Sequence, residues 1–185
     1  MKKLRLFMGA LALCGASSAF AQESGEYYLY EPTTGHFLSR GDSWGSRSVT
    51  DQYGLLFTWD KAEGTITFKD SGLRLFVTND RQIFTDNTSN STGWKFTEVE
   101  GGYTLQYADD SYIGYPDASS YNVNFVDSKE KAIVWQFLGR DQRDKIVQNY
   151  EMLNYDNIIA KALTYLPADI ISVLEQFCDR VRGNV

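Results

Sequence analysis

The chain has 185 residues, a formal net charge of −6, and 15% aromatic residues. An acidic chain without a basic patch is unsuited to nucleic acid, because binding to phosphates depends on clustered Lys and Arg. Beyond the N-terminus no stretch is apolar enough to span a membrane, and the length suits one domain with a sizeable core.

The N-terminus, residues 1–21, has the layout of a secretory leader. Basic residues come first, an apolar run follows over residues 6–14, and the small-x-small motif Ala19-Phe20-Ala21 ends the segment. This order predicts a signal peptide that is cleaved after Ala21. Cleavage would remove three basic and no acidic residues, which takes the net charge from −6 to −9. We expect a bacterial protein that is secreted or periplasmic, or associated with the cell surface.

Two cysteines bear on how the chain is held together. Cys14 lies in the leader, where lipidation is the alternative to cleavage after Ala21, but Leu13 is a poor residue before a lipidated Cys. Cys178 is the one cysteine left after cleavage, so no internal disulfide is expected. We favour a buried thiol over an intermolecular bond.

Residues 22–140 have the composition of short strands separated by turns. Tyr, Phe, Trp, Thr and Val occur in alternating bursts, and Gly, Asp, Asn and Ser lie between them. The bursts fall into three groups of four. They are 27–30, 36–40, 46–50 and 55–61; 65–69, 73–78, 82–86 and 93–99; and 103–107, 111–115, 122–126 and 133–139.

Each group ends with a pair of aromatic residues two positions apart, which lie on one face of a strand. The pairs are Phe57 and Trp59, Trp94 and Phe96, and Trp135 and Phe137. A unit of about 40 residues cannot bury its apolar face alone, so three units must close on one another. The sequence therefore predicts a β-trefoil, in which six strands form a barrel filled by these aromatic pairs and three hairpins cap it. A four-bladed propeller is the alternative, but residues 141–185 contain no fourth copy.

Residues 141–185 have a helical pattern instead. The apolar positions Ile170, Leu174, Phe177 and Val181 follow helical spacing. Two shorter stripes precede them, and we expect two or three helices. Packing of these helices on the chain's own β domain is favoured over packing on a partner.

The segment GEYYLYEPTTGHFLSRGDSWG, residues 25–45, and the threefold repeat resemble the ricin-B-type β-trefoil lectins, and the segment also resembles secreted proteins of gut bacteria. The resemblance covers about residues 25–140 and implies carbohydrate binding. The chain departs from the lectins' Gln-x-Trp motif, since Phe57, Trp94 and Trp135 stand where the Gln is usual. The galactose site that this Gln supports is therefore not implied.

Candidate ligand-binding residues lie in the loops between the second and third strand of each group. They are Asp42, Trp44, Asp80, Asp117 and Tyr121. Sugars offer hydroxyl edges and C–H faces, so a carboxylate beside an aromatic ring is a suitable partner. The alternative is that Trp44 caps the barrel and that the other loops hold ordinary turn residues.

Catalysis has little support in the sequence. His36 is the only histidine and we interpret it as structural, so neither a hydrolytic triad nor a transition-metal site can be assembled. Arg40-Gly41-Asp42 also matches an integrin-binding tripeptide, which a three-residue motif supports only weakly. We expect no cofactor and no enzymatic activity. The predicted function is binding of a glycan or surface polysaccharide. The alternative is a protein-interaction or adhesin module that uses a trefoil surface or the amphipathic C-terminal helices.

Overall fold

A computed structural model describes residues 23–41, 45–86, 91–108, 111–117 and 121–165, together with single positions of the C-terminal tail. Its elements are twelve strands and one long helix, with a short 3₁₀ turn at Lys129–Lys131. The first six strands are β1 (Gly25–Glu31), β2 (His36–Gly41), β3 (Arg47–Asp51), β4 (Phe57–Asp60), β5 (Thr65–Phe68) and β6 (Arg74–Val77). The others are β7 (Ile83–Asp86), β8 (Trp94–Val99), β9 (Gly102–Tyr107), β10 (Tyr112–Gly114), β11 (Asn124–Val126) and β12 (Val134–Leu138), followed by the helix α1 (Arg140–Leu163).

A strand overlaps each of the twelve stretches that the sequence indicated. The alternation that predicted them is visible in β4, where Phe57 and Trp59 are buried while Thr58 and Asp60 are partly exposed. This is the pattern of a strand with one face on the core.

The strands form a closed antiparallel circuit of seven members. Pairing runs β1-β2-β3-β7-β6-β5-β4, and β4 returns to β1. The first strand makes this closure possible because it is shared between neighbours: residues 25–27 pair with β4, residues 28–30 with β12, and residues 30–31 with β2. From β12 a branch continues through β9, to which both β8 and β10 pair, and ends at β11.

The prediction of a β-trefoil with a six-stranded barrel is therefore wrong. The closed circuit includes β2, β3, β6 and β7, which the prediction assigned to capping hairpins. Among the described strands β5 and β8 share no ladder, and one backbone hydrogen bond, from Trp94 N to Gly64 O at 3.0 Å, joins that region. Instead β3 reaches β7 through the pair Arg47 and Phe84. The repeat located the strands but did not determine their partners.

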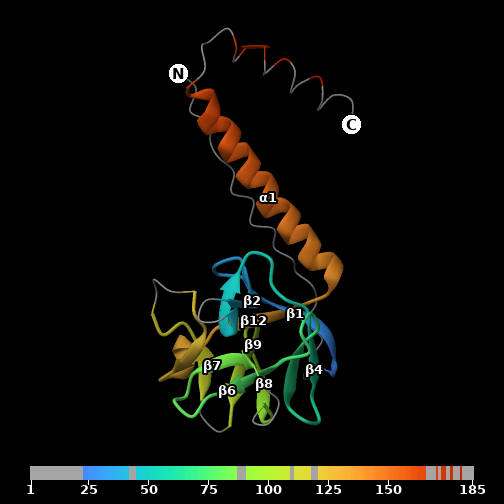
Figure 1. The fold of residues 1–185 in the computed structure, drawn as a ribbon, viewed down its shortest axis with the longest axis vertical. Helices are drawn as coiled ribbons and strands as arrows, with labels where there is room; N and C mark the ends of the chain where they lie inside the picture. Colours follow the sequence, from blue (N-terminus) through green and yellow to red (C-terminus); the bar gives the residue numbers. More distant parts are fainter. Residues whose placement is uncertain are drawn as a thin grey trace.

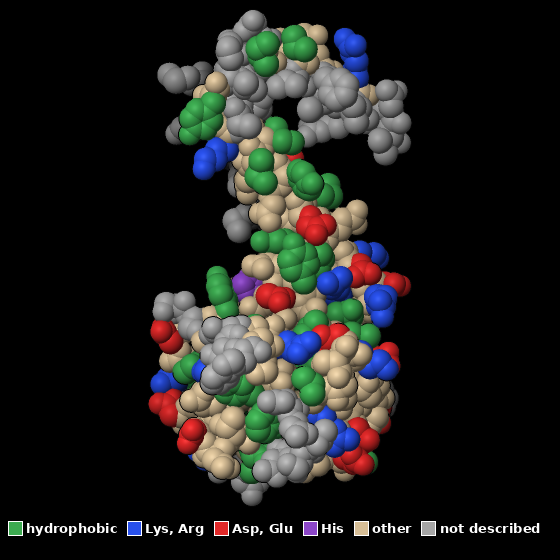
Figure 2. Space-filling model, viewed as in Figure 1, with side chains coloured by type: hydrophobic (Ala, Val, Ile, Leu, Met, Phe, Trp, Pro, Cys, Tyr) green, Lys and Arg blue, Asp and Glu red, His purple; other side chains and the backbone are tan. Residues whose placement is uncertain are grey.

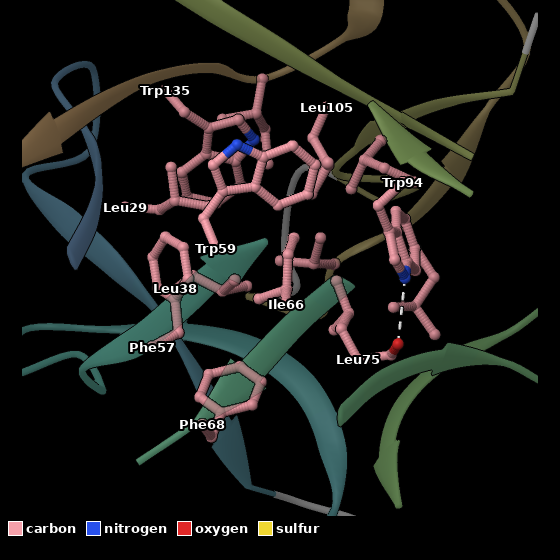
Figure 3. Close-up of a cluster of buried hydrophobic side chains, with 14 residues drawn as sticks. Leu29, Leu38, Phe57, Trp59, Ile66, Phe68, Leu75, Trp94, Leu105 and Trp135 are labelled. Carbon is pink, nitrogen blue, oxygen red and sulfur yellow. Dashed lines mark hydrogen bonds between the residues drawn. The ribbon is translucent and has the colours of Figure 1, made fainter. Parts of the chain in front are cut away.

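The core lies inside this arrangement and combines aromatic rings, among them Trp59, Trp94 and Trp135, with aliphatic side chains (Figure 3). Phe57, Trp59, Trp94 and Trp135 are at most 3% exposed, which agrees with their interpretation as interior residues. Phe96 and Phe137 are partly buried, and their ring centroids lie 4.6 Å apart. Full burial of one large apolar side chain contributes about 1.5–3 kcal/mol, so this layer is a major source of stability.

Helix α1 leaves the β domain and projects away from it (Figure 1). Its first turns are anchored: Val147 is buried against Tyr28, Phe37 and Leu138. Arg143 adds a hydrogen bond from its Nε to the Tyr53 carbonyl oxygen at 2.7 Å. The sequence correctly placed helix after residue 140, whereas beyond residue 150 its described side chains are exposed and not packed on the chain's own β domain. No helix among the described residues is long and apolar enough to cross a bilayer.

Candidate functional site

The structure describes three of the five predicted binding residues. Asp42 and Trp44 lie outside the described residues, so their positions stay predictions. Asp80 is exposed in the turn between β6 and β7. Asp117 and Tyr121 are exposed in the segment between β10 and β11.

Tyr121 is the predicted residue with the most distinctive surroundings. Its side chain is 59% exposed, although its ring contacts the His36 ring at a centroid distance of 4.7 Å. The Thr50 N–H donates to the Tyr121 carbonyl oxygen at 2.9 Å, and Asn122 bridges to Val49. The backbone of β3 therefore fixes the position of an aromatic ring that presents much of its surface to solvent.

Thr50, whose backbone binds Tyr121, belongs to a group of linked polar side chains. The Tyr115 hydroxyl lies 3.0 Å from the Thr50 hydroxyl, and burial raises the pKa of Tyr115 above its ordinary value of 10.0 although hydrogen bonds to Thr50 and Thr34 oppose the shift. Glu31 is 4% exposed, and its carboxylate accepts the backbone N–H groups of Thr33 and Thr34 and the Thr34 hydroxyl. We call this group the Tyr121 cluster. Its members are Glu31, Thr34, His36, Thr50, Tyr115 and Tyr121.

His36 connects the ring to the interior. It is 8% exposed, and the Gln52 side-chain amide donates to its Nε2 at 3.2 Å. An imidazole that accepts at Nε2 carries its proton on Nδ1, and Nδ1 is buried without a hydrogen-bond partner among the described residues. Burial lowers the pKa of His36 below 6.5, against the opposing effects of Asp51 and Glu31. The ring is therefore neutral near pH 7, and Tyr121 rests on an uncharged aromatic surface.

Asp80 belongs to a different part of the surface. The neighbouring Arg81 donates to the Ser111 hydroxyl at 2.8 Å and lies over the Phe125 ring at 4.9 Å. These contacts place the Asp80 turn beside β10 and β11. Tyr121 instead contacts His36 of β2 and Thr50 of β3. The structure thus joins Tyr121 to residues of the first group of strands and gives no contact between it and Asp80.

Sequence reasoning missed four members of the cluster. Glu31 and Thr34 could have been found from the run Glu-Pro-Thr-Thr-Gly, because Pro and Gly mark a turn whose backbone N–H groups can donate to a nearby side chain. Tyr115 and Thr50 gave no signal, since their approach depends on contact between strands far apart in sequence. His36 was interpreted as structural, and its burial agrees with that role while its position beneath Tyr121 adds a second one.

A second polar feature is an open pocket of about 340 Å³ over β4, β5 and β6, lined by threonines, acids and bases. Its cations already have partners: Lys69 Nζ lies 2.8 Å from Glu26, and Arg74 lies 3.9 Å from Glu63. Phe68, its one aromatic lining residue, is fully buried and offers no platform. The Tyr121 cluster is therefore the stronger candidate.

Among the described residues, no group of three or more His, Cys, Asp or Glu side chains could hold a metal ion. The Tyr121 cluster instead combines one exposed ring with hydroxyl and carboxylate groups. Such an arrangement can hold a ligand that has both an apolar face and a hydroxylated edge.

Comparison with known proteins adds the following. No family model matches the chain, and no curated protein matches it. The crystal structure of the lysenin pore is similar over 65% of this chain and 50% of that chain, with a TM-score of 0.48 and 13% identity. A complex of lysenin with phosphocholine is similar over 64% of this chain and 48% of that chain, with a TM-score of 0.48 and 14% identity. The chain thus spans about half the length of these lysenin structures.

The strand pairing corrects the resemblance to ricin-B-type lectins. The closed circuit has seven strands instead of the six of the predicted barrel. The inference of a ricin-type lectin module of gut-bacterial proteins is withdrawn with the trefoil.

Proposed function

We propose that the chain is a non-catalytic carbohydrate-binding module and that Tyr121 is the face on which a sugar lies. The observation that carries the proposal is the 59% exposed Tyr121 ring, held against the buried His36 at 4.7 Å. An exposed aromatic ring is ordinary at a surface, but one whose backbone and inner face are both fixed is preorganised for contact. Preorganisation reduces the entropy lost on binding, which otherwise weakens affinity.

The neighbouring groups suit the other half of a sugar. The exposed Asp117 lies in the same β10–β11 segment as Tyr121, and the hydroxyl of the half-buried Tyr115 lies 3.0 Å from that of the buried Thr50. Sugar hydroxyls both donate and accept, so they can use such a mixed set. Few well-placed polar groups around an apolar surface are typical of small-molecule sites.

An exported location fits this role. The leader predicted over residues 1–21 supports a secreted or periplasmic protein, where glycans and surface polysaccharides are available. Non-catalytic binding is proposed because His36 is committed to contacts with Gln52 and Tyr121.

The test is an array of host and plant oligosaccharides and polysaccharides, followed by calorimetric titration of the best binder. Tyr121→Ala should weaken binding about 30-fold, since a central aromatic contact is worth at least about 2 kcal/mol. Tyr121→Phe keeps the ring and should retain most of the affinity. Tyr53→Ala is the matched control, because it removes another exposed tyrosine ring that is not a member of the Tyr121 cluster.

Two results would oppose the proposal. A blank array, or equal affinity for wild type and Tyr121→Ala, excludes a sugar site at this ring. Phosphocholine, the molecule in the lysenin complex, should be titrated in parallel. Binding of phosphocholine with a blank glycan array would replace the sugar with a headgroup as the ligand of this protein.

A further inference from the structure

We propose that helix α1 is a self-association surface and that a second copy of this chain covers its exposed apolar side chains. The second half of the helix carries five large apolar side chains that are each 47–69% exposed: Met152, Leu153, Tyr155, Ile158 and Ile159. Figure 2 shows apolar side chains following the projecting helix beyond the β domain. Such a concentration on a protruding element marks an interaction surface.

The β domain cannot cover this surface. The helix is anchored through Arg143 and Val147, and contact ends at Tyr150, whose ring lies 6.5 Å from the Tyr53 ring. Five residues separate Val147 from Met152, and in an α-helix this step turns the side chain by about 140° away from the anchored face. Tyr155 and Ile159 lie about 80° and 120° from the anchored face, and Ile158 lies within about 20° of it. The group is therefore uncovered because it lies beyond the domain, where the described side chains are exposed.

The spacing of the stripe suits another helix. Met152, Tyr155 and Ile159 follow the three-then-four interval of a helix seam, and Ile158 lies beside them. A second copy presents the same seam, so one surface satisfies both partners, as in twofold dimers.

Charge favours a second copy over a lipid surface. Helix α1 contains four basic and four acidic residues, so two copies of it do not repel, although the whole chain has a net charge of −6. Over residues 151–163 a single Lys161 stands against Glu151 and Asp156. Helices that lie on anionic membranes carry an excess of Lys and Arg, which this segment lacks.

The available area is sufficient when the tail contributes. Five half-exposed side chains supply roughly 500 Å² per copy, taking about 100 Å² from each. Three further exposed apolar residues follow α1 in the sequence: Tyr165, Ile170 and Val173. Together they approach the roughly 800 Å² per partner of a stable interface.

The experiment measures the mass of the purified protein by sedimentation and light scattering up to about 100 μM, well above a micromolar Kd. Wild type should be a dimer, and the double variant Tyr155→Ser with Ile159→Ser should raise the dissociation constant at least about tenfold. Its monomer should keep the wild-type circular dichroism spectrum, because neither side chain packs on the domain. Asn154→Ser with Asn157→Ser is the matched control on the same helix and should leave the dimer intact.

A monomeric wild-type protein throughout this range overturns the proposal. Binding of that monomer to vesicles containing an anionic lipid would then assign the stripe to a membrane surface. An unchanged dimer in the Tyr155 and Ile159 double variant also refutes it, since association would then use another surface.

Discussion

Replacing Trp94 with Phe should destabilise the protein more than the same replacement at Trp135. Both indoles are buried in the same core, with exposures of 3% and 0%. Trp94 Nε1 donates to the Leu75 carbonyl oxygen at 2.9 Å (Figure 3). Trp135 Nε1 is buried and has no hydrogen-bond partner among the described residues. The two substitutions therefore remove similar volumes, but Trp94 loses an indole N–H that is hydrogen-bonded and Trp135 loses one that is not.

The magnitude follows from this difference. Loss of ring volume costs both variants a similar amount, so that contribution cancels in the comparison. Trp94→Phe also removes a donor from a buried carbonyl, which costs about 1–3 kcal/mol. Trp135→Phe removes an unmatched buried N–H and recovers part of its desolvation cost. We expect Trp94→Phe to be the more destabilising by about 2 kcal/mol or more.

Urea unfolding followed by tryptophan fluorescence and circular dichroism measures this difference. With an m value of about 2 kcal/mol/M, the midpoints of the two variants should differ by about 1 M. Equal midpoints, or a lower midpoint for Trp135→Phe, would show that the hydrogen bonding of the two indoles does not control their contributions.

Two further predictions concern the β domain. Gly114→Ala places a Cβ 2.4 Å from a backbone carbonyl oxygen and should cost more than about 3 kcal/mol, whereas Gly41→Ala meets only an ordinary contact at 3.6 Å and should be nearly neutral in the same unfolding assay. Comparable midpoints for the two variants would contradict this. The second concerns His36, whose lowered pKa means that the unfolded chain binds its proton more readily. The free energy of unfolding should be constant above about pH 6.5 and fall as the pH decreases through the folded pKa, and His36→Gln should flatten this part of the profile. An unchanged slope in the variant would assign the pH dependence to other groups.

The positions of the strands could be predicted from the sequence, but their partners could not. Alternation in stretches such as 57–60 and 94–99 is a local property, so it reports each strand directly. Strand pairing depends on contacts between residues that are distant in the sequence. In the circuit, β3 pairs with β7 through the single register pair of Arg47 and Phe84. The regular repeat in the sequence therefore predicted a threefold barrel, whereas in the structure β1 pairs with three neighbouring strands.

The binding role of the candidate residues stays a prediction. Tyr121 is exposed as a binding residue must be, while its support by His36 depends on two groups of strands meeting. A lone histidine beside an apolar doublet gave no sign of that contact. Asp42 and Trp44 stay predictions because they lie outside the described residues.

The shared first strand has a consequence for how the molecule matures. Tyr28 is paired with Leu138, so the ladder between β1 and β12 joins one of the first residues of the domain to one of the last. A chain synthesised or exported from its N-terminus cannot complete this arrangement until nearly all of it has emerged. Ordering of the domain is then a late event that requires closure of a large loop.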